Sequence, residues 1–432
     1  MSDSPECSLF EVLPTVYGGR STFAKQDITK GTLVLKCAAP YSSVILRKFR
    51  KEVCGWCFSY SFEHGKRKWD TKFDTGNKNS APPIVFCTDD CLNTWERNYQ
   101  DPGTAKALSW LQIHSNFEKT VTQETAGLAK STNASRFTTF STNLSLHLQT
   151  LSGGDVTKEN MEEAWRLAEE TFSKPKTILS ALRELGRSSV SSDNGVFLTE
   201  FEADSARFIL DGLFTRTFQA MPSAPSSSET SSSGDRNDSA FNIGSWNDLL
   251  ELQVLELDNI RSRPSLLASF IRVYGFVKYI ISSTSGPSGP PIEASSLGGV
   301  LLGLVSNSNV VRDILARDHS NVFGIWEQAE DDVDCEMLGW GMFVFGAYFN
   351  HDCEPTIVKK REGRSLMFYT MRDVAAGEEL CTSYIDVSAE STLEKRNAEL
   401  EGEWFFTCQC ERCQRERGGV DKAVKKSETS LP

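Results

Sequence analysis

The sequence predicts an α+β fold in which two strand-rich ends enclose a helical middle. Apolar, β-branched runs such as "GTLVLKCAAPYSSVI" lie near the N-terminus, and "SLMFYTM" and "EELCTSYI" lie in the last quarter of the chain. Between these ends, long segments place apolar residues at helical spacing. Closely spaced cysteines lie beside the strand-like runs, which indicates metal sites at these positions.

Composition sets the broad class of the protein. The chain has 432 residues, of which 39% are hydrophobic and 24% charged, so it can bury a large core. Its net charge of -12 argues against direct nucleic-acid binding and suits a basic partner. The sequence has no run of about 18 apolar residues, so a membrane span is not predicted. The start "MSDSPECSLFEV" lacks the features of a secretory signal, so we expect reduced cysteines and a cytoplasmic or nuclear location.

Residues 11–50 are predicted to form turns and short strands. The run around Cys37 is apolar, as is the later run around Cys381. Both thiols are therefore expected to be small core residues rather than ligands.

Residues 51–98 are predicted to form a zinc-binding segment. Cys54 and Cys57 lie in "VCGWCF", and Cys87 and Cys91 lie in "FCTDDCLNTW". Each pair brings two thiolates to one side of a tight turn, which suits tetrahedral zinc. The alternative is two unrelated loops with free thiols, but two close pairs within this short segment favour a metal.

Residues 99–335 are predicted to be mainly helical. Helical spacing recurs in "TAKALSWLQIHS", "NMEEAWRLAEETF", "TILSALREL", "FEADSARFILDGLFTRTF", "WNDLLELQVLEL" and "SLLASFIRVYGFVKYI". Low-complexity stretches near 223–240 and 283–296 are expected to be disordered loops, because they hold too few apolar residues to pack.

Strand signals return in residues 336–388, where "RDVAAGE" is interpreted as a hairpin or short connection between two strands. In residues 389–416, Ser391 and Glu394 have the spacing of a capping box and predict a helix through "EKRNAELEG". The charged residues 417–432 are expected to be loose.

The stretch "WFFTCQCERC" offers three thiols in one short loop, namely Cys408, Cys410 and Cys413. A closed zinc site needs four ligands, so one more must come from elsewhere. Whether the two strand-rich ends form one domain with an insertion or two unrelated modules is not decided by spacing alone.

Four motifs together resemble a known family. "FNHDCEP", "GEELCTSY" and the final Cys-x-Cys-x2-Cys resemble the SET domain of protein lysine methyltransferases, and "GGRSTFAKQDITKGTLVL" resembles its N-terminal segment. A split SET domain with a zinc module between its halves is similar to the SMYD family, the SET-and-MYND methyltransferases, including divergent fungal members. The implied fold is a β-rich SET domain split by a reduced MYND-like zinc finger and a helical insertion, with a zinc-stapled post-SET segment.

The resemblance implies an S-adenosylmethionine-dependent protein-lysine N-methyltransferase of the EC 2.1.1 class. Its substrate would be a protein with a reactive lysine, either a basic histone tail or a non-histone protein, and the enzyme would be a monomer. Cys353 would join the three C-terminal cysteines around one zinc ion. Two structural Zn²⁺ sites are then expected, because methyl transfer needs no metal at the reacting centre.

The resemblance also implies roles for individual residues. Tyr384 would be the catalytic residue that orients the lysine amine. The cofactor would be bound by Gly19, Arg20, Thr22, Asn350, His351, Trp404 and Phe406. Ordinary structural roles stay open for several of these residues. Gly19 and its neighbours could form a simple surface turn, and Phe406 could simply pack in the core.

Three positions depart from the family pattern. Ser21 stands where a second glycine is usual, Ala347 where a serine is common, and Thr356 where an asparagine is usual. The departures at Ser21 and Thr356 favour an alternative function, a catalytically weak or inactive SET-fold scaffold that mediates protein–protein interaction. A further alternative is a pair of independent zinc-binding modules.

Overall fold

The computed structural model describes most of the chain and has the predicted α+β architecture. The described residues are 7–17, 19–63, 66–67, 69–73, 84–99, 106–129, 142–152, 154–188, 197–220, 243–284, 297–328 and 335–418. The loop predicted near 223–240 and the residues after 418 lie outside them. So does the loop predicted near 283–296, except for two residues that end a helix.

Strands come from both ends of the chain, and helices from the middle. The strands are β1 (Phe10–Pro14), β2 (Arg20–Ala24), β3 (Leu33–Cys37), β4 (Ser42–Ile45), β5 (Phe62–Glu63), β6 (Lys66–Arg67), β7 (Thr71–Phe73), β8 (Ile84–Phe86), β9 (Phe323–Trp326), β10 (Met337–Met342), β11 (Ile357–Glu362), β12 (Ser365–Thr370) and β13 (Glu379–Leu380). The α-helices are α1 (Asp89–Tyr99), α2 (Lys106–Ala129), α3 (Asn143–Leu151), α4 (Lys158–Thr171), α5 (Pro175–Ser188), α6 (Glu200–Ala220), α7 (Trp246–Leu250), α8 (Glu256–Ser262), α9 (Ser265–Thr284), α10 (Leu297–Leu304), α11 (Asn309–Asn321) and α12 (Leu393–Trp404). The 3₁₀ helices are η1 (Arg47–Phe49) and η3 (Val344–Tyr348), and residues 411–418 are also helical.

Three small antiparallel sheets in the described residues each combine N-terminal and C-terminal strands. Their orders are β1-β2-β13, β4-β10-β9 and β11-β12-β3. In the first, Thr22 pairs with Leu380, and in the third, Leu35 pairs with Phe368. The two ends of the chain therefore form one β unit, which is inconsistent with two independent modules. The precise domain boundaries stay a prediction.

Of the two interpretations of "RDVAAGE", a hairpin or a short connection, the structure shows the short connection. β12 pairs with β11 and β3, whereas β13 pairs with β2, so the connection crosses from one sheet to another. A bridge between Val374 and Ile28 anchors this crossing. Local sequence could not reveal this, because the partner of β13 lies more than 300 residues earlier in the chain.

The helix predicted to begin with Ser391 is present, but its cap is one residue later. Thr392 is the N-cap of α12, and its side chain accepts a hydrogen bond from the Lys395 N–H. The carbonyl of Ser391 instead accepts from the guanidinium of Arg396. The helix is therefore capped by Thr392 and not by Ser391.

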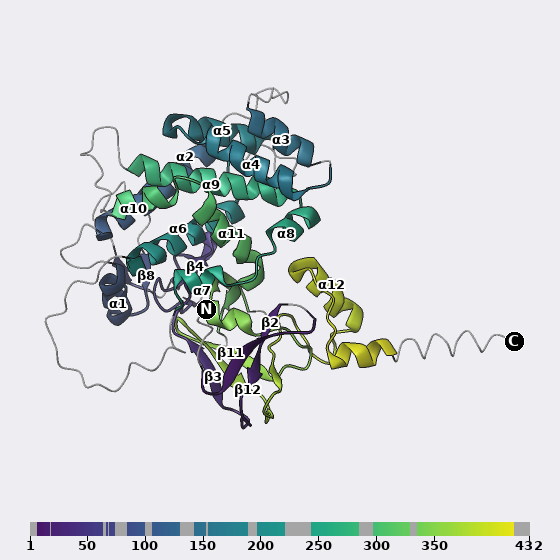
Figure 1. Ribbon diagram of the computed structural model, residues 1–432. Helices are drawn as coiled ribbons and strands as arrows, with labels where there is room; N and C mark the ends of the chain where they lie inside the picture. Colours follow the sequence, from purple (N-terminus) through teal and green to yellow (C-terminus); the bar gives the residue numbers. More distant parts are fainter. Residues whose placement is uncertain are drawn as a thin grey trace.

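The helical middle covers one side of the β unit, as Figure 1 shows. α6 packs on β4, and α9 contacts α2, α5 and α6. One continuous apolar core runs through both regions, from Phe10 and Leu35 in the strands to Phe276 in α9. Cys37 lies in this core and Cys381 is also buried, as predicted. The strands that carry the site are thus fixed against a helical support.

α9 is the one described helix long and apolar enough to cross a membrane. However, 61% of its most apolar window is buried inside the protein. The helix also packs against its neighbours at close range: a Cβ added at Gly275 would meet the ring of Phe172 at 2.7 Å. These features are those of a central core helix.

A buried ion network joins the helices to the zinc-binding segment. The carboxylate of Glu118 on α2 accepts from Arg207 on α6 at 2.7 Å and from Arg50, just after η1, at 2.6 Å. Only 5% of the Arg207 side chain is exposed. Burial alone would raise the pKa of Glu118, but the two guanidinium groups overcome this and lower it to about 2.

We predict that Glu118→Gln lowers the free energy of unfolding by about 3 kcal/mol, because it removes the buried carboxylate that Arg50 and Arg207 share and leaves Arg207 with Asp204 alone. Urea denaturation at neutral pH measures this. Glu163→Gln is the control, because Glu163 pairs with Arg166 on the exposed face of α4, and it should leave the stability nearly unchanged. Equal effects of the two variants would contradict a special role for the buried network.

The same network predicts a pH dependence. The pKa of Glu118 is lowered from its ordinary value of 4.5 to about 2, so its stabilising effect is complete above 4.5. This effect is lost as the pH falls through 2, because the carboxyl group then binds its proton. The stability difference between the parent and Glu118→Gln should therefore shrink as the pH is lowered through this window.

Candidate active site and metal centres

The structure sorts eight of the twelve cysteines into two sets. The N-terminal cysteine set consists of Cys54, Cys57, Cys87 and Cys91, and the sulfur atoms all lie within 4.8 Å of one another. The first two lie on the turn after η1, the third follows β8, and the fourth is in the first turn of α1. The Sγ of Cys87 is 3.5 Å from that of Cys57 and 3.5 Å from that of Cys91.

The C-terminal cysteine set consists of Cys353, Cys408, Cys410 and Cys413, again with all sulfur atoms within 4.8 Å. Cys353 follows η3, whereas the other three lie in the loop after α12 and at the start of the helical residues 411–418. The Sγ of Cys353 lies 3.9 Å from that of Cys408 and 3.6 Å from that of Cys413.

Both sets fit a zinc ion. Four sulfurs at a Zn–S distance of about 2.3 Å in a tetrahedron lie about 3.8 Å apart, close to the separations seen here. Thiolate sulfur is also the ligand that structural zinc sites use most.

The predicted site residues meet where two segments run side by side. The main-chain carbonyl of Asn350 accepts a hydrogen bond from the Thr382 N–H at 2.9 Å. The main-chain carbonyl of Thr382 accepts one from the Asp352 N–H at 3.0 Å. A parallel bridge also pairs His351 with Thr382. The segment 349–353 therefore lies beside the segment 380–384, which brings Tyr384 next to the "NHDC" motif.

Tyr384 lies at the centre of this group. Its hydroxyl donates to the Phe349 carbonyl at 2.9 Å, and its main-chain N–H donates to His351 Nδ1 at 3.0 Å. Burial raises the pKa of the Tyr384 hydroxyl, so the group keeps its proton at neutral pH. The residue can therefore donate and orient hydrogen bonds, and it is not set up to act as a base.

His351 links the site to the C-terminal cysteine set. Burial lowers the pKa of His351 to about 4, so the ring is neutral at physiological pH. Because Nδ1 accepts from Tyr384, the ring proton belongs on Nε2, which lies 3.3 Å from the Sγ of Cys353. One side chain thus contacts both the tyrosine and a cysteine ligand.

Asn350 faces the loop between β1 and β2. Its Nδ2 lies 3.1 Å from the Arg20 carbonyl, 3.2 Å from the Tyr17 hydroxyl and 3.5 Å from the Glu379 carboxylate. The structure therefore brings the predicted cofactor loop and the predicted cofactor asparagine together.

The three predicted residues of that loop differ in position. Gly19 has a φ of 73°, a left-handed conformation that favours glycine. The Arg20 guanidinium pairs with Glu251 at 3.3 Å and lies over the ring of Tyr348. Thr22 is buried, and its hydroxyl donates to the Leu380 carbonyl at 3.1 Å. The Thr22 hydroxyl is thus engaged between β2 and β13, away from Asn350.

Two aromatic residues from the C-terminal segment complete the group. Trp404 ends α12, and the next residue, Phe405, has a left-handed φ of 60° that turns the chain back. The ring of Trp404 lies 5.8 Å from that of Tyr384, and the ring of Phe406 lies 6.1 Å from that of His351. Such a cluster offers aromatic faces to a ligand with a positive charge.

Sequence reasoning missed Tyr17 and Glu379. The Tyr17 hydroxyl donates to the Glu379 carboxylate, and both contact Asn350. Glu379 lies in the quoted "GEELCTSY" motif, which could have marked it, but its direction depends on the pairing of β13 with β2. Ser21, the second residue of β2, is fully buried, and its hydroxyl has no hydrogen-bond partner in the described structure.

Comparison with known proteins supports this geometry. A family model of the SET domain matches residues 19–385. A Saccharomyces cerevisiae protein named "Potential protein lysine methyltransferase SET6" is 24% identical over 424 residues, which are 95% of this chain and 96% of the yeast protein. The "Histone-lysine N-methyltransferase SET5" of Eremothecium gossypii is 34% identical over 93 residues, 21% of this chain and 19% of that protein. A SET and MYND domain-containing protein of Dictyostelium discoideum is 28% identical over 110 residues, 26% of this chain and 27% of that protein.

The family match includes strands from both ends of the β unit together with the "NHDC" and "GEELCTSY" segments. These are the segments whose pairing places Asn350 and His351 beside Tyr384. The match spans most of the chain, and on this evidence the protein belongs to the SET domain family.

Proposed function

We propose that the protein is an S-adenosylmethionine-dependent protein-lysine N-methyltransferase. The observation that carries the proposal is the convergence of Tyr384 with Asn350, His351, Trp404 and Phe406, which come from three separate segments. The names of the yeast and Eremothecium relatives point in the same direction. A SMYD-like organisation, with a reduced MYND-type finger around the N-terminal cysteine set, is part of the proposal.

The residues present fit the cofactor. The Asn350 side chain, the main chain of His351, and Gly19 and Arg20 would hold its polar groups. The unpartnered hydroxyl of Ser21 on β2 offers a further polar atom next to Arg20. Trp404 and Phe406 would cover its ring and its positive charge. When bound, S-adenosylmethionine supplies a methyl group carried on a positively charged sulfur.

The protein's own task is to position the substrate amine. The lysine must arrive without its proton, which passes to solvent, because only the free amine has a lone pair. The protonated hydroxyl of Tyr384 and the carbonyl of Phe349 lie 2.9 Å apart and could orient that amine. Fixed orientation of the two reactants is a large source of rate in such reactions.

The substrate class follows from charge and from the relatives. A net charge of -12 suits a basic protein segment such as a histone tail, although a non-histone lysine fits the same chemistry. We further propose that the protein acts as a monomer in the cytoplasm or the nucleus, without direct contact to nucleic acid or membrane.

A second candidate function, a SET-fold scaffold without catalysis, is favoured by one observation. Polar groups that would hold the cofactor are engaged within the protein: Arg20 pairs with Glu251, and the Asn350 amide faces Tyr17 and Glu379. Titration calorimetry with S-adenosylmethionine separates the two candidates. Binding supports the enzyme, and its absence in zinc-loaded protein supports the scaffold.

We predict two zinc ions per chain, measured by elemental analysis of purified protein. Cys410→Ser should lose one of them and weaken cofactor binding, because it opens a site whose metal binding is coupled to the folding of the C-terminal segment. Cys335→Ser is the control, since Cys335 belongs to neither set. Intact cofactor binding by Cys410→Ser would contradict the coupling.

We predict that Tyr384→Phe lowers the methylation rate at least about tenfold, which corresponds to about 1.4 kcal/mol of lost transition-state stabilisation. Thermal stability and cofactor affinity should change little, because the ring stays in place. Tyr369→Phe removes a hydroxyl whose hydrogen bond, among the described residues, is to the sulfur of Met367, and it should keep full activity. A labelled-cofactor assay on protein substrates compares the three proteins. If Tyr384→Phe is as active as the parent, the assigned role is wrong.

We predict a different behaviour for Asn350→Ala. Loss of one hydrogen-bonding side chain should raise the dissociation constant of the cofactor about tenfold. Calorimetry measures this constant directly. A variant that binds the cofactor normally but methylates slowly would move Asn350 from the binding group to the catalytic group.

A further inference from the structure

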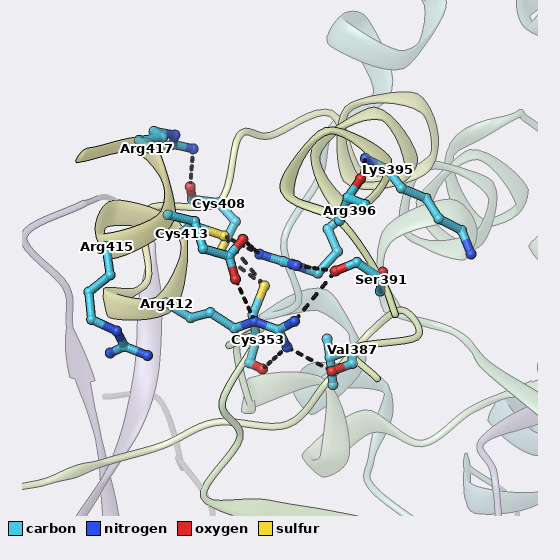
Figure 2. A network of polar contacts seen from close by, with 12 residues as sticks. Cys353, Val387, Ser391, Lys395, Arg396, Cys408, Arg412, Cys413, Arg415 and Arg417 are labelled. Atoms are coloured by element: carbon cyan, nitrogen blue, oxygen red, sulfur yellow. Dashed lines mark hydrogen bonds and ion pairs between the residues drawn. The ribbon is translucent and has the colours of Figure 1, made fainter. Parts of the chain in front are cut away.

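A fully buried arginine beside the C-terminal cysteine set has no role in the function proposed so far. Arg396 lies on α12 and is 0% exposed. Its Nη2 donates to the Glu416 carboxylate at 2.6 Å and lies 3.7 Å from the Sγ of Cys413, while its Nη1 donates to the Ser391 carbonyl. Figure 2 shows this guanidinium pointing at the cysteines from the helix.

A second arginine closes the same network. Arg412 donates through Nε to Glu416 at 2.9 Å and through Nη1 to the Val387 carbonyl at 2.7 Å. It also lies 3.4 Å from the carbonyls of Cys353 and Ser391. The two arginines share Glu416 and the Ser391 carbonyl, so they tie α12, the segment before it and the helical residues 411–418 together, as Figure 2 shows.

The charge of the site explains why a buried guanidinium is needed. A zinc ion with four thiolates carries a net charge of about -2. Burying this charge without compensation is costly, and a guanidinium that donates to a sulfur offsets part of it. An arginine keeps its charge in such a place, and its guanidinium reaches the Cys413 sulfur and the Glu416 carboxylate at the same time.

The N-terminal cysteine set has a different environment and serves as an internal comparison. Arg361 donates to the carbonyl oxygen of Cys57 at 3.4 Å, not to its sulfur. In the part of the chain that the structure describes, no arginine donates to a sulfur of that set.

We propose that Arg396 is a positioning residue that places a buried positive charge beside the sulfur atoms of the C-terminal cysteine set and thereby holds Trp404 and Phe406 against Tyr384. The inference rests on the zinc site proposed above. Trp404 is the last residue of the helix that carries Arg396, and Phe406 precedes Cys408 by two residues. A loosened metal therefore frees both aromatic residues from the site.

The test compares Arg396→Met, which keeps the approximate length without the charge, with Arg396→Lys, which keeps the charge. Arg415→Met is the matched control: the same charge is lost from the helical residues 411–418, at an exposed pair with Glu354. Zinc release from the native proteins is followed with a chromogenic chelator. Alkylation of the freed thiols, located by peptide mass spectrometry, shows which set has opened.

Arg396→Met should release one zinc about 10 to 100 times faster than the parent, the range expected when a partner of a metal ligand is removed. The alkylated residues should be those of the C-terminal set, with the N-terminal set unchanged. Arg396→Lys should recover part of the loss, and Arg415→Met should behave as the parent. Release at the parent rate by Arg396→Met, or no recovery by Arg396→Lys, overturns the proposal.

Glu416→Gln keeps both arginines but removes their shared carboxylate. It therefore tests whether the charge of Arg396 retains the zinc, even if Arg396→Met fails to fold. If charge is the cause, Glu416→Gln holds its zinc at least as long as the parent. Rapid release from the C-terminal set would mean that the network is only a tether, and it would overturn the proposal. Parent protein without zinc in this set would instead refute the zinc site itself, a result that the parent's metal content distinguishes.

Discussion

The site depends on a parallel contact between two backbone segments, 349–353 and 380–384. Parallel neighbours cannot be joined by a tight turn, so the chain must leave and return between them. It does so through β11 and β12, which pair along their whole length around a turn at Gly363, where φ is 57°. β13 then pairs with β2, which places the loop of Gly19 and Arg20 beside Asn350. Tyr384 reaches His351 only because these pairings hold.

The C-terminal segment adds the aromatic residues but has little core of its own. A small cluster of Cys353, Ile385, Leu400, Cys408 and Cys413 is separate from the main core. So few apolar side chains bury little area, and a metal that joins Cys353 to the later cysteines would supply the missing stability. The buried guanidinium of Arg396 contributes to the same stabilisation, because four close thiolates repel one another unless cations lie among them. The geometry around Tyr384 therefore depends on the structure of the C-terminal cysteine set.

The helical insertion supports the β unit that carries the site. α6 lies on β4, where the Asp211 carboxylate accepts from the Ser43 N–H at 2.7 Å. The ion network of Glu118, Arg207 and Arg50 connects the insertion to the turn that precedes the N-terminal cysteine set. A charged network of this kind is costly to assemble but fixes the relative position of its elements once it is formed. The Arg20 contact with Glu251 also joins the insertion to the segment that we propose binds the cofactor.

Local patterns in the sequence were sufficient for the α+β class, the helical middle and the paired cysteines Cys54, Cys57, Cys87 and Cys91, because spacing within a turn or a helix is short-range information. The resemblance to SET domains correctly supplied Cys353 as the fourth member of the C-terminal set. At "RDVAAGE" the short connection was right and the alternative hairpin was not. The cap at Ser391 was wrong, and Tyr17, Glu379 and Arg396 were missed. Each of these depends on a contact with a residue distant in the chain or on burial that outweighs a local preference. Strand pairing and the burial of charged side chains depend on how distant parts of the chain pack together, so only the tertiary structure decided them.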